Sequence, residues 1–462
     1  MDASSADPTL LIANSRTVEM VGDLTALDPA ERLAGGHSAL RMLWFAGTGD
    51  AVVLPFRPSE AYLAYVTALT GTDPASLAIL IPPHDRLGGE LVTPDRTADT
   101  GFRERVRTVV AERGIDRVSA VFTDVSVTQL AEAVGLSVSG HAFHAQGGAA
   151  LVNSKAGFRA IASGAGAPIA AGLCTGYRAE ARDLIGRMFG AGHAVILKRE
   201  FTGGGLGNEI LSPVPGVRVA GAPQDVVLPD PAALDDYLGR RWDWLSAGGR
   251  NRVVVEQYLA GCDTVYAEYL VGEAGAEPIG FGELLMAPVA VGQVVHGPTV
   301  TPRVRADLLA AGRPLLAALH AIGYRGVLST DCVLTPAGDV VITETNGRIS
   351  GSTHLHVSIE ARVLAPEHRG RRVLVERFGL PVPSFGAAAE RLAATGLGFD
   401  RRTGTGVLLT SDLAPDGTVS YCLVAADLPA TLAMRERLAG LFARPAGREQ
   451  TGPVPTDLLK EG

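Results

Sequence analysis

The sequence predicts an α/β protein built from three successive units. Over residues 8–150, short apolar runs alternate with helical patterns, which is typical of βαβ units and a mostly parallel sheet. From residue 151 onward, one helical segment is followed by hairpins and long β-rich segments that continue to residue 346. A smaller unit begins after residue 363. We therefore expect three domains, at 1–150, 151–362 and 363–462.

The first unit is expected to contain four strands, at residues 10–14, 51–55, 76–82 and 118–122. Ser59 predicts a helix through Leu69, because a serine oxygen can accept a hydrogen bond from the first helical turn. An arginine-rich helix is expected around 102–113. The glycine-rich stretch 35–41 fits neither GxGxxG nor GxSxG, and we interpret it as a tight turn before a helix.

The later elements follow from turn signals and periodicity. A helix is expected over 177–189, before the β-rich segments. The last unit is expected to be a small αββα unit, and Pro415-Asp416-Gly417 between its strands is a good hairpin signal. Its elements are a helix (385–395), a strand (406–411), a strand (418–426) and a helix (429–442). The tail after Pro445 is expected to be loose.

Charge and cysteine usage exclude several classes of function. The 462 residues carry a net charge of −8 without a polybasic stripe, which argues against nucleic acid as the main partner. The uncharged stretch 160–177 is rich in Gly, Ser and Pro and is not typical of a membrane span. Four widely spaced cysteines predict free thiols, and the N-terminus lacks a basic leader, so we expect a cytoplasmic protein. His141 and His144 have no further metal-type ligands beside them, which favours a structural role.

Lysine is nearly absent from the chain. Only Lys155, Lys198 and Lys460 occur, against thirty-eight arginines. A surface cation can be Arg or Lys, whereas a compact ammonium group on a flexible stem cannot always be replaced by a planar guanidinium. Lys460 lies in the tail. Lys155 and Lys198 are therefore candidate functional residues, with chance retention as the alternative.

A glycine-rich loop follows one of these lysines. The apolar run 194–197 leads to Lys198, and four glycines occupy five positions shortly after it. Bare backbone N–H groups in such a loop can approach phosphate oxygens, because no Cβ blocks them. No Gly-Lys dipeptide exists in the chain, so a Walker P-loop is excluded. We interpret the segment as a hairpin flap able to close over a triphosphate, with a mobile hairpin tip as the alternative. Its residues are Gly203, Gly204, Gly205, Leu206 and Gly207.

Two strands joined by a short link are expected over 252–271. The main chain of such a link can hydrogen-bond an adenine edge, and an acid such as Asp263 can accept from a ribose hydroxyl. On the residues alone, a plain strand–turn–strand segment is the favoured interpretation.

The strongest pattern is a hairpin whose two apolar strands carry acids. Pairing across its turn with Leu334 opposite Val341 sets Asp331 opposite Glu344. Facing carboxylates repel each other unless a cation lies between them. Asn346, two residues after Glu344, lies on the same face. Three oxygen donors of this kind suit Mg²⁺, and exposed acids at a hairpin end are the alternative.

This combination of motifs resembles the ATP-grasp superfamily and, within it, the peptide ligases related to that of pheganomycin biosynthesis. The superfamily likeness covers about residues 151–360. The narrower likeness rests on Glu19–Leu24 and Gly36–Trp44 in the first unit and on the small C-terminal unit. The resemblance implies an ATP-grasp fold with an N-terminal Rossmann-like pre-ATP-grasp domain.

The resemblance also implies roles for the residues that carry it. Lys155 and Lys198 would hold ATP phosphates beneath the glycine loop. The link would meet adenine through the main chain of Gln257 and Leu259, with Tyr258 between them, Glu256 beside the amino group and Asp263 near the ribose. One or two Mg²⁺ ions would be held by Asp331, Glu344 and Asn346.

Catalytic arginines are implied as well. Arg348, on the same alternation as Asn346, would stabilise the reacting carboxyl and phosphoryl oxygens. A second catalytic arginine has no secure position in the sequence. Arg303 and Arg305, before a helix, are the candidates.

The implied reaction is a carboxylate–amine ligation through an acyl phosphate, with release of ADP and phosphate. By the narrower likeness, the amine is a peptide N-terminus and the acid is an amino acid with a guanidino-type group. An ATP-grasp carboxylase or a kinase-like phosphoryl transferase is the alternative, and a non-enzymatic ATP-binding scaffold is the third. The expected partners are small molecules, without nucleic acid or membrane, and the C-terminal unit is a candidate homodimer interface or substrate cover.

Overall fold

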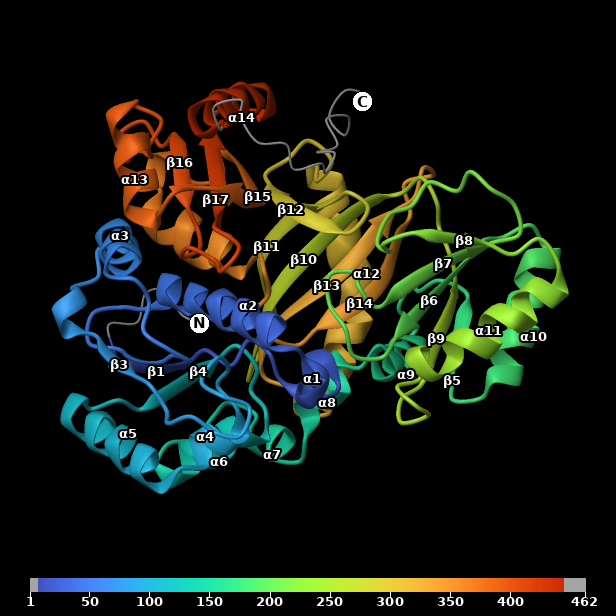
Figure 1. The fold of residues 1–462 in the computed structure, drawn as a ribbon, viewed down its shortest axis with the longest axis horizontal. Helices are drawn as coiled ribbons and strands as arrows, with labels where there is room; N and C mark the ends of the chain where they lie inside the picture. The colour runs from blue at the N-terminus through green and yellow to red at the C-terminus, as the bar shows by residue number, and fades with distance from the viewer. Residues whose placement is uncertain (1–6, 444–462) are drawn as a thin grey trace.

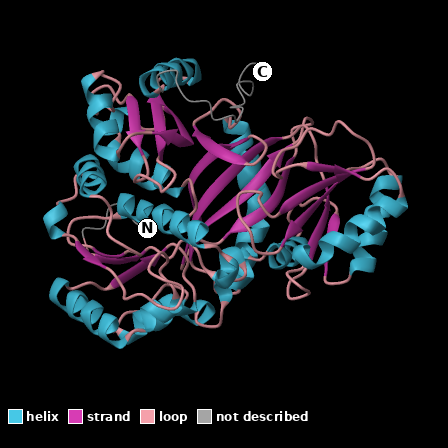
Figure 2. Ribbon diagram, viewed as in Figure 1, coloured by secondary structure: helices cyan, strands magenta, loops and turns pink. Residues whose placement is uncertain are grey.

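The computed structural model describes residues 7–443, which form three sheets with helices around them (Figures 1 and 2). The predicted loose tail after Pro445 and Lys460 lie outside the described residues. In Figure 1 the N-terminal sheet lies at one end, a large sheet in the middle and a smaller sheet at the other end. Within residues 7–443, no helix has the length and apolar character needed to cross a membrane.

The N-terminal sheet is parallel and has the order β3-β2-β1-β4, which confirms the four predicted strands. The predicted helix after Ser59 is also confirmed, and the Ser59 side chain accepts a hydrogen bond from the Tyr62 N–H. The strands are β1 (Thr9–Ile12), β2 (Ala51–Val53), β3 (Ala78–Leu80) and β4 (Arg117–Ala120). The helices are α1 (Val18–Val21), α2 (Pro29–Ala39), α3 (Glu60–Thr70), α4 (Pro94–Ala98), α5 (Thr100–Arg113), α6 (Val125–Ala133) and α7 (His141–His144), with 3₁₀ turns at Leu24–Ala26, Leu40–Phe45 and Pro74–Ser76.

The expected turn at residues 35–41 is wrong, because Gly35 and Gly36 lie inside α2. A Cβ on Gly36 would lie 2.2 Å from the carbonyl oxygen of Glu90, and a Cβ on Gly35 would lie 2.6 Å from Cγ of Arg16. The two glycines therefore serve close packing rather than a change of chain direction. The helix begins after Asp28, whose side chain accepts from a backbone N–H of the first turn.

The smaller sheet has the order β5-β9-β6-β7-β8, with α10 and α11 on its outer side (Figure 1). The helix predicted over 177–189 is confirmed as α10, but α11 lies in a segment that we expected to be β-rich. Asp230 caps α11 and Pro231 begins it, so its start carries ordinary helix signals. The strands are β5 (Gly172–Thr175), β6 (Val195–Arg199), β7 (Asn208–Ser212), β8 (Asp225–Val227) and β9 (Val253–Gln257). The helices near this sheet are α8 (Gly148–Asn153), α9 (Lys155–Ala165), α10 (Arg178–Gly190) and α11 (Pro231–Leu245).

The large sheet has eight strands in the order β14-β13-β10-β11-β12-β15-β17-β16. The helix, two strands and helix predicted over 385–442 are confirmed, but a further strand, β15 (Val373–Pro381), precedes them and was not predicted. These strands extend the large sheet. The strands are β10 (Asp263–Gly272), β11 (Gly275–Met286), β12 (Ala290–Val295), β13 (Gly326–Leu334), β14 (Val340–Asn346), β15 (Val373–Pro381), β16 (Gly406–Leu409) and β17 (Thr418–Ala425). The helices are α12 (Pro302–Ala321), α13 (Phe385–Ala394) and α14 (Leu428–Phe442), with a π-helix at Leu355–Val363 and a 3₁₀ turn at Pro366–His368.

One hydrophobic core joins the N-terminal unit to the large sheet and the C-terminal elements. Leu11, Trp44, Leu374 and Leu409 are fully or almost fully buried in it. The Trp44 indole N–H also donates to the Thr410 carbonyl at 3.0 Å. This shared core fixes the N-terminal sheet against the large sheet.

Candidate active site

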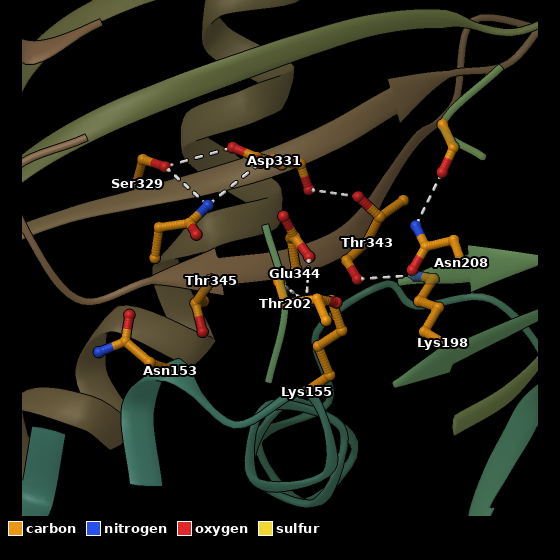
Figure 3. Close-up of polar contacts among 12 residues, drawn as sticks. Asn153, Lys155, Lys198, Thr202, Asn208, Ser329, Asp331, Thr343, Glu344 and Thr345 are labelled. Atoms are coloured by element: carbon orange, nitrogen blue, oxygen red, sulfur yellow. Dashed lines mark hydrogen bonds and ion pairs between the residues drawn. The ribbon is translucent and has the colours of Figure 1, made fainter. Parts of the chain in front are cut away.

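Side chains from α9, the smaller sheet and the large sheet converge at one place (Figure 3). Lys155 is the first residue of α9, after the capping residue Ser154. Lys198 comes from β6, and Asp331 and Glu344 come from β13 and β14. Figure 3 shows Glu344 between Asp331 and Lys155, with Lys198 beside Thr343. The structure therefore brings the two scarce lysines and the paired acids together.

A β-bulge places the two carboxylates on one face. Near the turn, Leu334 pairs with Val340, so the expected Leu334–Val341 pair is wrong by one residue. The register then shifts between Asp331 and Cys332, and Asp331 pairs with Glu344 as predicted. In a regular strand Glu344 would share the face of Ile342, which is buried in the core. The bulge at Thr343 turns Glu344 to the opposite face, toward Lys155.

The facing carboxylates repel each other, and a cation between them would relieve that repulsion. Burial, and then the charge of Glu344, raise the pKa of Asp331. Burial also acts to raise the pKa of Glu344, but Lys155 and Lys198 outweigh it and hold that pKa below its usual value. The Asn346 amide donates to Asp331 Oδ2 at 3.1 Å, and the Ser329 hydroxyl donates to Asp331 Oδ1 at 3.2 Å. The side chains of Asp331, Glu344 and Asn346 thus lie together, with the amide nitrogen of Asn346 toward Asp331.

Both lysines are buried and have defined partners. Lys155 Nζ lies 3.3 Å from Glu344 Oε2 and donates to the Thr202 carbonyl at 2.5 Å. Lys198 Nζ donates to the carbonyl of Thr343, the bulge residue, at 3.1 Å. The ammonium groups therefore connect the acidic hairpin to the glycine loop.

Glu256 pairs with two cations. Its Oε2 lies 2.6 Å from Lys198 Nζ, and its Oε1 lies 2.5 Å from Arg159 Nη1. Sequence reasoning missed Arg159, although it follows Lys155 by four residues on α9 and so lies on the same helix face. In the structure Glu256 holds Lys198, and its implied contact with the adenine amino group stays a prediction.

The glycine loop is the tip of the predicted hairpin, because Lys198 on β6 pairs with Asn208 on β7. Gly204 and Gly205 adopt φ of +64° and +82°, a region that favours glycine. The Cβ of an alanine at Gly205 would lie 2.7 Å from the Gly221 carbonyl oxygen. Asn208 donates to that same carbonyl at 2.8 Å, while its own Oδ1 is buried without a partner. Gly203 faces Met20, Gly207 leaves room for the Thr202 side chain, and Leu206 is exposed.

The link after β9 leaves polar main-chain atoms for a ligand. The N–H groups of Gln257 and Tyr258 donate to the carbonyls of Ala171 and Ala194. The Leu259 N–H, by contrast, has no acceptor among residues 7–443. The Tyr258 hydroxyl donates to the Arg218 carbonyl at 2.8 Å, and Asp263 is exposed at the start of β10. The implied adenine and ribose contacts of this link stay predictions.

Arg348 lies two residues beyond Asn346, the last residue of β14. Its Nη1 donates to Asn153 Oδ1 at 2.7 Å, and its guanidinium lies over the Phe122 ring, 5.2 Å from the centroid. Asn153 Oδ1 also accepts from the Gly347 N–H at 3.1 Å, so Asn153 is a positioning residue that sequence reasoning missed. A cavity of about 890 Å³ between the N-terminal and large sheets has Arg348 in its wall.

The structure does not bring Arg303 to these residues. Its side chain is 88% exposed on α12, with Nε 3.7 Å from Asp307. Arg305 donates to His296 Nδ1 at 3.2 Å and lies near the Phe281 ring. A catalytic role for either arginine stays a prediction without a contact in the described chain.

Other metal and thiol candidates have structural partners. His144 Nε2 lies 2.9 Å from the Arg325 carbonyl, and His141 Nε2 lies 2.9 Å from Glu132. No group of three or more His, Cys, Asp or Glu side chains suited to a metal occurs within residues 7–443. The predicted site has only two carboxylates and one amide, so a metal there would need water or substrate oxygens to complete its shell. All four cysteines are unpaired, as expected.

Comparisons with known proteins identify the fold of the chain. The Pre ATP-grasp domain family model matches residues 39–136, and the PGM1 C-terminal domain model matches residues 387–438. Together with the sheet arrangement and the structural neighbours, the first match shows that the chain has the ATP-grasp fold, with an N-terminal pre-ATP-grasp domain. No curated protein matches the sequence.

Among solved structures, the chain is similar to two biotin carboxylases and one synthetase. The biotin carboxylase domain of the Hydrogenobacter thermophilus 2-oxoglutarate carboxylase, solved with MgADP, ADP and bicarbonate, has a TM-score of 0.56 and 14% identity, over 94% of this chain and 90% of that one. Campylobacter jejuni biotin carboxylase has a TM-score of 0.55 and 14% identity, over 94% and 91%. An N5-carboxyaminoimidazole ribonucleotide synthetase in complex with ADP has a TM-score of 0.54 and 15% identity, over 94% of this chain and 97% of that one. Identity at this level shows a shared fold.

Proposed function

We propose that this protein is an ATP-dependent ligase that activates a carboxylate as an acyl phosphate and joins it to an amine. The observation that carries the proposal is the convergence of two buried lysines, two facing carboxylates and an amide beneath a glycine hairpin. ATP-grasp neighbours solved with ADP or MgADP support a nucleotide at the corresponding place.

The residues fit a magnesium nucleotide. Asp331 and Glu344 would supply carboxylate oxygens and Asn346 its amide oxygen, the hard donors that magnesium prefers. Burial and the facing Glu344 carboxylate raise the pKa of Asp331, and a cation between the two acids would oppose that effect. Magnesium held there would neutralise charge on the phosphates. Lys155 and Lys198 would bind phosphate oxygens from the other side, and the Leu259 N–H would donate to an acceptor nitrogen on the adenine edge.

The reaction needs charge neutralisation and exclusion of water rather than a nucleophilic side chain. An oxygen of the substrate carboxylate attacks the γ-phosphorus, and the bond from that phosphorus to the β,γ-bridging oxygen breaks to release ADP. The amine nitrogen then attacks the acyl carbon, the carbon–oxygen bond to phosphate breaks, and the nitrogen gives its proton to water or phosphate. Arg348 would stabilise the oxygens that gain charge, and the glycine hairpin would keep water from the acyl phosphate.

The 890 Å³ cavity is the proposed place for the bulk of one substrate, because it reaches Arg348 and lies in the size range of ligand pockets. By the resemblance stated above, we propose an amino acid with a guanidino-type group as the acid and a peptide N-terminus as the amine. The PGM1 C-terminal domain match falls on the small C-terminal elements that carry the narrower resemblance. A cytoplasmic location and a homodimer belong to the same proposal.

The test measures ADP release by the full chain with ATP and Mg²⁺ while acids and amines are supplied together and singly. We expect ADP release that requires both substrates, a product whose mass equals acid plus amine minus water, and loss of activity when Mg²⁺ is chelated. Lys198→Ala should lower kcat/KM by about a hundredfold or more, since one charge-stabilising group is removed. Arg86→Ala, which removes a largely exposed cation paired with Asp95, is the matched control and should stay active.

A carboxylase is the second candidate, because two of the structural neighbours are biotin carboxylases. Bicarbonate belongs in the acid panel for that reason. ADP release with bicarbonate and an acceptor, together with a product heavier by CO₂, would favour the carboxylase. ADP release that needs no amine or other acceptor would contradict the ligase.

A further inference from the structure

The carboxyl end of β4 lies beside Arg348, because the N–H of the next residue, Ile349, donates to the Val121 carbonyl at 3.0 Å. In the order β3-β2-β1-β4, the chain connections lead to opposite sides at the β1/β4 junction. Ligands of open parallel sheets bind at such a switch point, outside the carboxyl ends of the strands. Asn14, just after β1, bridges the two ends because its side chain donates to the Phe122 carbonyl at 2.8 Å and accepts from the Phe122 N–H at 3.1 Å.

Arg348 lies beside the β1/β4 junction with most of its hydrogen-bonding capacity unused. A guanidinium carries five N–H donors. Within residues 7–443, the only acceptor of Arg348 is Asn153 Oδ1. The guanidinium lies over the ring of Phe122, the residue that Asn14 ties to β1. Several donors of Arg348 are therefore free for an anion at this junction.

Arg16 is a second guanidinium near the end of β1, and it has no partner in the described chain. It follows Asn14 by two residues, and its stem lies against α2 where Gly35 leaves space. The described chain offers its side chain neither a hydrogen bond nor a carboxylate within 4.0 Å. Arg96 in the same unit is enclosed too, but it donates to the carbonyls of Pro83, Gly89, Pro55 and Pro82. Arg16 therefore differs from Arg96, which is enclosed in the same unit and has its donors satisfied.

The two guanidiniums act on each other electrostatically. Burial lowers the pKa of Arg348, the charges of Glu344 and Asp331 oppose that effect, and the charge of Arg16 adds to it. Burial also lowers the pKa of Arg16, against the charge of Glu31. Two partly desolvated cations that act on each other repel, and an anion that accepts from both relieves the repulsion.

We propose that Arg16 and Arg348 together bind the carboxylate of the acid substrate, with Arg16 as a substrate-binding residue contributed by the N-terminal domain. The proposal rests on the ligase function proposed above and names the group that holds its acid. Arg348 follows Asn346 by two residues, and the Asn346 amide donates to Asp331 Oδ2 at 3.1 Å, so a carboxylate held by Arg348 lies near the proposed phosphate site. The glycine at position 35 of α2 then has a purpose, because it leaves room for the stem of Arg16.

The test is a thermal unfolding series of the full chain with sodium acetate as the carboxylate probe and sodium chloride at matched ionic strength. We expect acetate to raise the Tm of the wild type more than chloride does. Arg16→Ala should lose that difference, Arg16→Lys should keep part of it, and Arg86→Ala should keep all of it. A wild type without an acetate-specific shift, or an Arg16→Ala variant that keeps the full shift, would overturn the proposal.

A second variant separates binding from folding. Gly35→Ala favours the helix but places a methyl group against the Arg16 stem, so it should fold and still lose the acetate-specific shift. Retention of the shift in Gly35→Ala counts against the proposal.

Kinetics then distinguish this proposal from the ligase function. With an acid that supports ADP release, Arg16→Ala should raise the KM for the acid at least tenfold and leave the KM for ATP unchanged. An equal rise in both KM values would show a structural role and contradict the proposal. If no acid and amine support ADP release while the acetate shift still depends on Arg16, the ligase fails and the carboxylate site stands.

Discussion

At the scale of single residues, Glu256 shows how the Lys198 side chain is held in place. Its carboxylate accepts from Lys198 and from Arg159, and all three side chains are buried. A buried carboxylate between two cations satisfies both of them, so its loss leaves two positive charges without a counter-ion.

Glu256→Gln is therefore expected to lower the free energy of unfolding by about 3–5 kcal/mol, the usual range when one member of a buried ion pair is removed. Urea unfolding of the full chain, followed by circular dichroism, measures the change. Asp235→Asn is the control, because it removes a carboxylate from an exposed pair with Arg182 and should leave the midpoint almost unchanged. Equal effects of the two substitutions would mean that Glu256 is not a counter-ion for Lys198.

The site residues that could be predicted from the sequence either belong to a scarce residue type or are acids that face each other across a hairpin. Lysine is scarce enough that Lys155 and Lys198 stand out, and facing acids on apolar strands draw attention to Asp331 and Glu344. Arg159, Arg16 and Asn153 could not be predicted in this way. The chain has thirty-eight arginines, so one more carries no signal until its partners, or their absence, are visible.

At the scale of elements, the glycine hairpin and the bulge of β14 position the side chains of the site. The hairpin could be predicted because a strand, a glycine run and a second strand follow each other locally. The bulge could not, because it arises from pairing between β13 and β14 and leaves no local mark at Thr343. It corrects a register that would otherwise place Glu344 on the core face.

The hairpin gives a matched pair of variants. Gly204 and Gly205 both have positive φ, so alanine costs about 1–2 kcal/mol of backbone strain at either position. Only Gly205 has a backbone atom in the way, the Gly221 carbonyl oxygen, while a Cβ on Gly204 meets nothing within 4 Å. Gly205→Ala should therefore weaken MgADP binding at least about tenfold more than Gly204→Ala does, a difference of about 1.4 kcal/mol. Titration calorimetry compares the two, and equal affinities would show that the contact with Gly221 does not shape the loop.

At the scale of the whole molecule, the site exists because three sheets are fixed against one another. The parallel N-terminal sheet and the order of the C-terminal elements follow from local patterns, and both could be predicted. The joining of β15, β16 and β17 to the large sheet could not, because it depends on pairs between β12 and β15 that lie about eighty residues apart. The same long-range packing, through Trp44 and its partners, brings the carboxyl ends of β1 and β4 to Arg348.

The proposed nucleotide site is best tested by a crystal structure of the full chain with Mg²⁺ and a non-hydrolysable ATP analogue. We expect a magnesium ion roughly 2.0–2.1 Å from carboxylate oxygens of Asp331 and Glu344, as magnesium requires. We also expect phosphate oxygens in contact with Nζ of both Lys155 and Lys198. A nucleotide bound elsewhere, or bound between the sheets with its metal away from these two acids, would contradict this proposal.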